Sequence, residues 1–260
     1  NGPGDEVDLT RDGVPLTTLP ISQTSHEDAG LSPAVYEYCW TVRIGDGTSP
    51  TICRTARVLA DPTDFNCAAV SGEVDITWTN NDTYGQFTLN RDGQLLALLP
   101  GDVSSFHDAS AGAGLHTYDL TARRGPRSTS STVDCSVDVP STPVDMACSA
   151  LGSTVSLSWT LPAPGDAVEL SRNGSVIATL AGDATSFDDT GVAAGNYDYC
   201  VVNTIGSGTS ATTCCSARVI AAPSGFSCLS VSGDVELGWI NDVDGDGISD
   251  IVVGAPGADN

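Results

Sequence analysis

The sequence has no lysine, and its ten cationic side chains are all arginines, set against 33 aspartates and glutamates. The formal net charge is −23. Each phosphate of a nucleic acid or of an anionic membrane requires a cationic contact, which so acidic a surface does not offer. We therefore expect no nucleic acid as a partner. Acidity without lysine also fits a high-salt or marine habitat, and the sequence leaves that alternative open.

Long apolar runs, helical periodicity and histidine are scarce as well. No stretch of 18 apolar residues occurs, so we expect no membrane insertion. No segment of ten or more residues has the period of an amphipathic helix. Only three histidines are present and no two cysteines have the CxxC spacing, which argues against a structural zinc site.

Residues of the catalytic types are also poorly placed for catalysis. Ser105, His107 and Asp108 have the residue types of a hydrolytic set. They lie within four residues of one predicted strand, which is too local to orient a nucleophile, a base and a third group. No glycine-rich phosphate loop follows a strand. We expect no enzyme activity and no catalytic residue.

What the sequence does contain is an internal repeat of about 80 residues. Arg-Asp-Gly at 11–13 and 91–93 corresponds to Arg-Asn-Gly at 172–174, and a tryptophan recurs in the phrases VDITW, VSLSW and VELGW. A repeat of this length determines the architecture. It divides the chain into a partial unit that lacks its opening strands, two whole units, the opening strands of a further unit, and a final segment, at 1–61, 62–141, 142–221, 222–239 and 240–260.

The repeated unit has the pattern of antiparallel strands. Apolar residues alternate through Val74, Ile76 and Trp78, which is typical of a half-buried strand. Asp92-Gly93 and its equivalents predict two-residue hairpin turns, because both positions require positive φ. A short strand, a polar turn and a long strand with two tyrosines are expected next, at 24–40, 104–120 and 185–201. The fold class is therefore predicted to be all-β.

The order of these features over residues 1–239 resembles the fibronectin type III module in its divergent bacterial form. The resemblance implies tandem antiparallel immunoglobulin-like β-sandwiches. In such sandwiches a tyrosine near the start of the sixth strand bonds back to the corner backbone, and Tyr36 and Tyr197 fit that position. The second unit departs from the pattern, with His116 in place of the tyrosine.

Alignment of the repeats sorts the nine cysteines into two kinds. One kind predicts disulfides between the first and last strands of a unit, Cys67–Cys135 and Cys148–Cys215. The other predicts bridges across the last hairpin, Cys39–Cys53 and Cys200–Cys214. Cys228 remains, and the position of its expected partner in the first unit is Arg54. Disulfides of this density indicate an extracellular or cell-surface location.

Residues 242–250 form an acidic loop ahead of the phrase VGAP. Carboxylates at loop positions 1, 3, 5 and 9 with glycines at 4 and 6 have the spacing of a calcium loop, although Val253 replaces the glutamate of an EF-hand. The segment resembles the FG-GAP repeat of integrin α-chains and bacterial surface proteins. That resemblance implies calcium as cofactor, held by side chains of four aspartates and one carbonyl, from Asp242, Asp244, Asp246, Asp250 and Ile248. The alternative is a solvated acidic turn.

Together these features predict a non-enzymatic extracellular structural protein, a spacer, stalk or filament subunit of disulfide-stapled β-sandwiches. The alternatives are a cell-surface adhesion module that binds surface proteins or glycans, and an accessory region of a larger secreted enzyme. A binding module would expose aromatic side chains on its loops. The two candidates, Trp40 and Tyr84, are expected to pack within strands instead.

The two ends of the repeat array predict self-association. The first unit lacks opening strands and a tryptophan, while residues 222–239 are opening strands without a sheet to join. Exposed sheet edges of both kinds invite strand addition between chains. We expect a head-to-tail homopolymer in which 222–239 packs on 5–58 of a neighbouring copy. The alternative is a longer polypeptide in which the same module is completed covalently.

Overall fold

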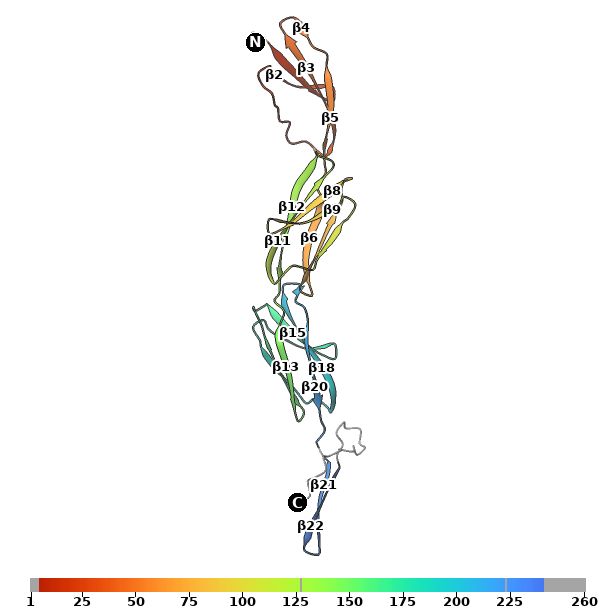
Figure 1. Ribbon diagram of the computed structural model, residues 1–260, viewed down its shortest axis with the longest axis vertical. Helices are drawn as coiled ribbons and strands as arrows, with labels where there is room; N and C mark the ends of the chain where they lie inside the picture. Colours follow the sequence, from red (N-terminus) through yellow and green to blue (C-terminus); the bar gives the residue numbers. More distant parts are fainter. Residues whose placement is uncertain (1–4, 127, 223, 241–260) are drawn as a thin grey trace, which may run out of the picture. The chain divides into compact units, whose positions relative to one another are not determined.

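The fold is all-β, as the sequence predicts. The computed structural model describes residues 5–126, 128–222 and 224–240, and these ranges hold strands and turns without a helix (Figure 1). Within them there is accordingly no helix of the length and apolarity needed to cross a membrane.

The strands follow the sequence repeat. Module one holds β1 (Glu6–Arg11), β2 (Val14–Pro20), β3 (Ala34–Ile44), β4 (Gly47–Thr48) and β5 (Ile52–Val58). Module two holds β6 (Thr63–Val70), β7 (Glu73–Thr79), β8 (Gln86–Arg91), β9 (Gln94–Pro100), β10 (Ser105–Asp108), β11 (Gly114–Arg123) and β12 (Thr129–Val139). Module three holds β13 (Val144–Leu151), β14 (Thr154–Thr160), β15 (Ala167–Arg172), β16 (Ser175–Ala181), β17 (Ser186–Thr190), β18 (Gly195–Ile205), β19 (Gly208–Thr209) and β20 (Thr213–Val219). A terminal hairpin holds β21 (Ser224–Val231) and β22 (Asp234–Ile240).

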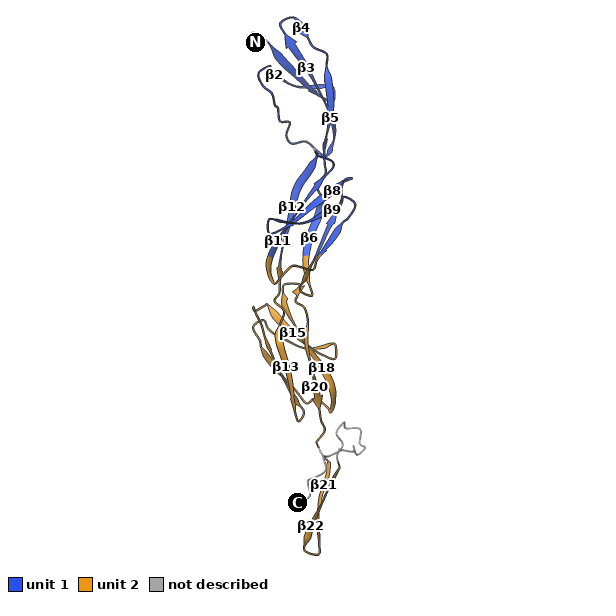
Figure 2. Cartoon of the chain, in the orientation of Figure 1, with its two compact units in different colours: residues 1–67, 75–107, 116–137 blue, residues 68–74, 108–115, 138–260 orange. Residues whose placement is uncertain are grey.

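The chain also divides into two compact units, which are distinct from the sequence repeats called modules (Figure 2). Unit one comprises residues 1–67, 75–107 and 116–137, and unit two comprises residues 68–74, 108–115 and 138–260. The five segment bounds expected from the repeat stay a prediction.

Two-residue turns join the first hairpin of each four- or five-stranded sheet, as the sequence predicts. Asp92 and Gly93 have φ values of 53° and 74°. Asp12-Gly13 and Asn173-Gly174 take the same left-handed conformation. β-Branched residues are strained at positive φ, whereas Asp, Asn and Gly tolerate it. The Asp-Gly and Asn-Gly pairs therefore fix these turns.

Module three is a two-sheet sandwich. One sheet has the order β13-β14-β17 and the other β16-β15-β18-β19, with β20 also paired to β18. Inward side chains of both sheets form one apolar core that includes Leu157 and Trp159 of β14, Leu170 of β15 and Tyr199 of β18. The core therefore depends on the β13–β14 hairpin being packed over the second sheet.

Module two has sheets of the same order, β10-β7-β6 and β12-β11-β8-β9. The Trp78 ring of β7 contacts the Phe87 ring of β8 with centroids 5.3 Å apart. Edge-to-face contact of this kind brings the two sheets together over a common core. The expected sandwich architecture is thus present twice.

Module one differs from the other two. Its strands form one sheet of order β2-β1-β3-β4, with β5 also paired to β3, and no second sheet is present among the described residues. The short strand expected near residues 24–28 is absent: β2 ends at Pro20 and the next strand, β3, begins at Ala34. In module three the equivalent β17 is held by pairing with β14, and module one has no counterpart of β14.

Candidate functional site

Four disulfides form the chemically distinctive framework of the described chain. Two join the first and last strands of a module, Cys67–Cys135 and Cys148–Cys215, with Cα atoms 6.0 and 5.9 Å apart. Two join directly opposed residues of neighbouring strands, Cys39–Cys53 and Cys200–Cys214, with Cα atoms 4.0 and 4.1 Å apart. These are the same four pairs that the repeat alignment predicts.

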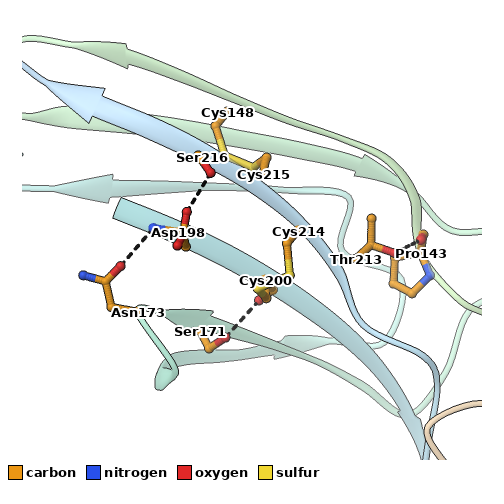
Figure 3. Close-up of a disulfide and its surroundings, with 10 residues drawn as sticks. All are labelled: Pro143, Cys148, Ser171, Asn173, Asp198, Cys200, Thr213, Cys214, Cys215 and Ser216. Atoms are coloured by element: carbon orange, nitrogen blue, oxygen red, sulfur yellow. Dashed lines mark hydrogen bonds between the residues drawn. A yellow bond between two sulfur atoms is a disulfide. The ribbon is translucent and has the colours of Figure 1, made fainter. Parts of the chain in front are cut away.

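The adjacent residues Cys214 and Cys215 serve both kinds of bridge (Figure 3). Successive side chains of a strand point to opposite faces. Cys215 therefore packs against the core of module three with Cys148, while Cys214 lies on the outer face with Cys200. On the same face Asp198 accepts a hydrogen bond of 2.6 Å from the Ser216 hydroxyl.

Within the described ranges, one cluster of three residues has the spacing of metal ligands: Glu37, Cys39 and Cys53. Its two sulfur atoms are joined in a disulfide, so neither is available as a thiolate. A metal ion requires the thiolate form of cysteine. The cluster is therefore part of the disulfide framework.

The predicted calcium ligands Asp242, Asp244, Asp246, Ile248 and Asp250 lie outside the described residues. Their donor set consists of oxygen atoms alone, four carboxylates and one carbonyl. Hard cations such as calcium prefer such donors. The residue types therefore fit the ion.

Residues of the hydrolytic types have other partners. The His107 Nδ1 atom lies 2.7 Å from Asp75 Oδ1, and both side chains are about half exposed. Asp108 accepts hydrogen bonds from the backbone and hydroxyl of Ser110. His107 thus behaves as the polar surface position that its alignment with Glu27 and Asp188 predicts.

The inner face of module one is an open apolar groove of about 710 Å³. Its floor comprises Val7 and Leu9 of β1 and Tyr36, Tyr38 and Trp40 of β3. Equivalent floor positions in module three, such as Val168, Leu170 and Val201, are fully buried. The groove is therefore a sandwich interior without its second layer.

Two sequence expectations fail in this groove. Trp40 was expected to pack within its sheet, but its side chain is 45% exposed. His26 aligns with Phe106 and Phe187 of the other repeats, which predicts a partly buried core residue, but its side chain is exposed and lines the groove. Both errors have one cause, since each side chain points to a face that no second sheet covers. Tyr84, by contrast, is buried, and its hydroxyl donates to the Ala60 carbonyl over 2.9 Å.

A charged network that sequence reasoning missed supports the rim of the groove. Arg11 Nη1 donates to both oxygens of Asp28 at 3.0 and 2.8 Å, and the Tyr38 hydroxyl donates to Asp28 Oδ2 at 2.6 Å. The hydroxyl of Tyr38 and the guanidinium of Arg11 hold the pKa of Asp28 below its ordinary value. The network ties the loop after β2 to the sheet.

Module three repeats this network. Arg172 and Tyr199 donate to Asp189 Oδ2 at 2.6 and 2.8 Å. Burial and the Asp189 carboxylate together raise the pKa of Tyr199 to about 12. The constant separation of 17 residues between the arginine and the aspartate is the sequence signal that could have revealed the network.

The corner tyrosines lie where the sequence predicts. Tyr36 donates its hydroxyl to the Ser32 carbonyl at 2.8 Å, and Tyr197 donates to the Ala193 carbonyl at 3.2 Å. In module two, His116 takes the place of the tyrosine, and its Nδ1 lies 2.8 Å from Asp92 Oδ2 instead. Each corner tyrosine also lies beneath the guanidinium of the network arginine, 5.6 Å from the ring centroid.

The terminal hairpin β21–β22 forms a two-stranded sheet with no further strand attached among the described residues. Its apolar side chains Phe226, Val235, Leu237 and Trp239 are exposed. Cys228 is an exposed free thiol. Arg54, at the position equivalent to Cys215, is also exposed and donates to the Cys53 carbonyl at 2.8 Å.

Comparison with known proteins gives one family match. The FG-GAP repeat family matches residues 237–260, which contain the acidic loop. The comparison with curated proteins found no match.

Among solved structures, the chain is similar to a segment of two fibronectin type III domains from chicken tenascin, at 18% identity and a TM-score of 0.34. That match covers 62% of this chain and 100% of that one. The fibronectin(III)-like modules of Clostridium thermocellum CbhA match at 13% identity, a TM-score of 0.34 and coverages of 61% and 93%. The FN1–FN3 domains of chicken CNTN1 match at 9% identity and a TM-score of 0.33, and that match covers 83% of this chain and 88% of that one. The chain thus has an all-β fold, shown by its own strands and sheet order, and over residues 237–260 it carries a match to the FG-GAP repeat.

Proposed function

We propose that the chain is a non-enzymatic extracellular structural protein, a spacer, stalk or filament subunit. The observation that carries this proposal is the disulfide between the first and last strands of modules two and three. Disulfides persist in oxidising, extracytoplasmic surroundings. A bridge that closes a module from end to end also limits how far it can be pulled apart.

The energetic effect of these bridges is large for small modules. Cys67–Cys135 closes a loop of 68 residues and Cys148–Cys215 one of 67. In the chain-entropy model, a loop of that size stabilises the folded state by about 4 kcal/mol. A small domain has a total stability of roughly 5–15 kcal/mol. Each bridge therefore supplies a large share of the stability of its module.

Single-molecule force extension tests this mechanical role. Under pulling from both ends, the oxidised chain should not release the loop that the Cys67–Cys135 bridge closes. Reduction should free that loop and add roughly 230 Å of contour length per module. Equal extension with and without reductant would contradict the proposal.

Mapping the bridges provides the chemical control. The chain has no lysine, so pepsin or chymotrypsin is a better choice than trypsin for digestion without reduction. Mass spectrometry should recover Cys39–Cys53 and Cys67–Cys135 as linked pairs, and the peptides of Cys148 and Cys200 both linked to the peptide that holds Cys214 and Cys215. Cys228 alone should be alkylated in the native protein. Alkylation of any bridged cysteine in the native protein would contradict both the pairing and the extracellular location.

We also propose that the loop at 242–250 binds calcium. Support comes from the spacing of its carboxylates and from the FG-GAP match over 237–260. Terbium luminescence sensitised by Trp239 would report binding directly. The Asp244→Asn/Asp246→Asn variant should lose the signal, whereas Asp234→Asn, outside the loop, should keep it. No luminescence in the unaltered chain would overturn this proposal.

A further inference from the structure

Modules two and three show what normally covers a groove like that of module one. The β13–β14 hairpin of module three packs its inward side chains over the second sheet. There Val155, Leu157 and Trp159 are 0%, 2% and 4% exposed. Their equivalents in the terminal hairpin, Val235, Leu237 and Trp239, are 65%, 51% and 55% exposed. Among the described residues, module one therefore has an apolar groove that no second sheet covers, and the terminal hairpin has apolar side chains that face no sheet.

We propose that the β21–β22 hairpin of one copy docks into the open groove of module one of a second copy and completes its sandwich. This inference builds on the proposed structural function and names its partner, a second copy of this chain. Donor and acceptor surfaces differ, so the contact is heterologous and propagates head to tail. A lone two-stranded hairpin is marginally stable in water, which favours its docking.

The register of the docked hairpin follows from module three. There β14 pairs with β17, and Leu157 lies opposite Phe187 while Val155 lies opposite Asp189. In module one the positions of Phe187 and Asp189 are His26 and Asp28. Leu237 should therefore lie opposite His26, and Val235 opposite Asp28. Residues near 24–28 would then gain the strand partner that they lack in this structure.

The tryptophan supplies two specific hydrogen bonds in the same register. In module three the Trp159 backbone donates to the Thr185 carbonyl at 3.0 Å, and its indole donates to the Ala184 carbonyl at 2.8 Å. The equivalent carbonyls in module one belong to Thr24 and Gln23. Docking would give the indole N–H of Trp239 a hydrogen-bond acceptor and would cover the apolar floor of the groove at the same time.

The area that the contact would bury is small for a specific interface. The inward apolar side chains of the hairpin, two of them aromatic, expose on the order of 500 Å². A standard specific interface buries roughly 800 Å² per partner, so backbone pairing must add to the side-chain contact. We expect a weak association that depends on protein concentration. The docked hairpin would have the same arrangement as in module three, where β13 and β20 are joined by Cys148–Cys215.

That disulfide suggests a direct test. The counterpart of Cys148 is Cys228, which is a free and exposed thiol, and the counterpart of Cys215 is Arg54. In the docked complex, Arg54→Cys should place a thiol against Cys228 of the neighbouring copy at the roughly 5.5–6 Å Cα separation that a disulfide needs. The variant puts a cysteine beside Cys53, as module three already has at Cys214 and Cys215.

The full chain with Arg54→Cys should give, after mild oxidation, a ladder of dimers and higher multimers on non-reducing gels. Reduction should collapse the ladder, and adding Cys228→Ser should abolish it. Val14→Cys is the matched control, since Val14 is highly exposed on the same module away from the predicted bridge. Leu237→Asp in the Arg54→Cys chain should slow ladder formation at least tenfold.

Several results would overturn the proposal. These are a bridge within one chain, multimers that stop at the dimer, an equal ladder from Val14→Cys, or no ladder at all. If Arg54→Cys disturbs folding, sedimentation of the unaltered chain against Leu237→Asp decides the matter: the unaltered chain should associate with rising concentration and the variant should not. The ladder uses cysteines outside the four mapped bridges, so its failure is distinguishable from failure of the proposed structural function.

Discussion

Module three and module one contain the same sheet, and among the described residues a second sheet covers it in module three alone. In both, the tyrosine-bearing strand (β3 or β18) lies beside the first strand of the Asp-Gly or Asn-Gly hairpin (β1 or β15), and both have the disulfide between opposed neighbours. Both also have the Arg–Asp–Tyr network and the corner tyrosine. The pairing, disulfide and corner tyrosine of the sheet therefore depend on contacts within that layer. The Arg–Asp–Tyr network joins the sheet to the segment that follows its second hairpin strand, and burial of the inner face depends on the covering hairpin.

The largest expected difference concerns the two equivalent tryptophans. Trp159→Ala should destabilise module three by about 4 kcal/mol, because a buried aromatic side chain is lost and a cavity remains. Trp239→Ala should leave the thermal unfolding of dilute chains unchanged, since that side chain is exposed. Differential scanning calorimetry of both variants measures this contrast. An equal loss from the two substitutions would contradict the view that the hairpin is uncovered in the separate chain.

A smaller difference should come from the network tyrosines. Tyr199 is buried and donates to Asp189, so Tyr199→Phe should cost module three about 1.5 kcal/mol at neutral pH. Tyr38→Phe should cost module one less, since the open groove leaves Tyr38 partly exposed. Urea unfolding of the two variants compares them. A greater loss from Tyr38→Phe would contradict the ranking.

The same tyrosine gives module three a specific pH dependence. The pKa of Tyr199 is raised to about 12 in the folded chain, above its ordinary value of 10.0. The unfolded chain therefore loses this proton first, and the stabilisation from the neutral phenol is present below pH 10 and is lost as the pH rises towards 12. Tyr199→Phe should flatten this part of the stability profile. If the free energy of unfolding of that variant still fell by the same amount between pH 10 and 12, the assignment of this pH dependence to Tyr199 would be wrong.

The smallest expected effect concerns a like-charge pair in the docked register. Ser156 lies opposite Asp188 in module three, and the equivalent pair across the proposed contact is Glu236 and Glu27. Opposed like charges on a sheet surface are unfavourable by about 0.5 kcal/mol. Glu27→Gln should therefore tighten self-association about twofold in sedimentation experiments. Weaker association of that variant would argue against the register.

Much of the fold could be predicted because it depends on local sequence. Asp12-Gly13 fixes a turn through its own backbone requirements, and alternation of apolar residues fixes which face of a strand is inward. The bridge pairs followed from repeat alignment, because equivalent strands carry equivalent cysteines. These signals need no knowledge of the neighbouring layer.

The exposure of the inner face could not be predicted in the same way. Trp40 and His26 occupy inward positions, and the sequence pattern alone does not show whether a second sheet covers them. The absent strand near 24–28 has the same origin, since a strand edge needs a partner for its backbone groups. The network around Asp28 was missed because separations of 17 and 10 residues match no local structural period, and only a comparison between the repeats reveals them.

Hydrogen exchange of the unaltered chain tests the central claim most directly, because it reports whether the hairpin and the groove protect each other. The amides of residues 22–29 and 224–240 should exchange rapidly in dilute solution, and at least about tenfold more slowly at high protein concentration. The amides of β14 and β17 should show slow exchange at both concentrations. Rates at 22–29 and 224–240 that do not change with concentration would contradict completion of module one by a second copy.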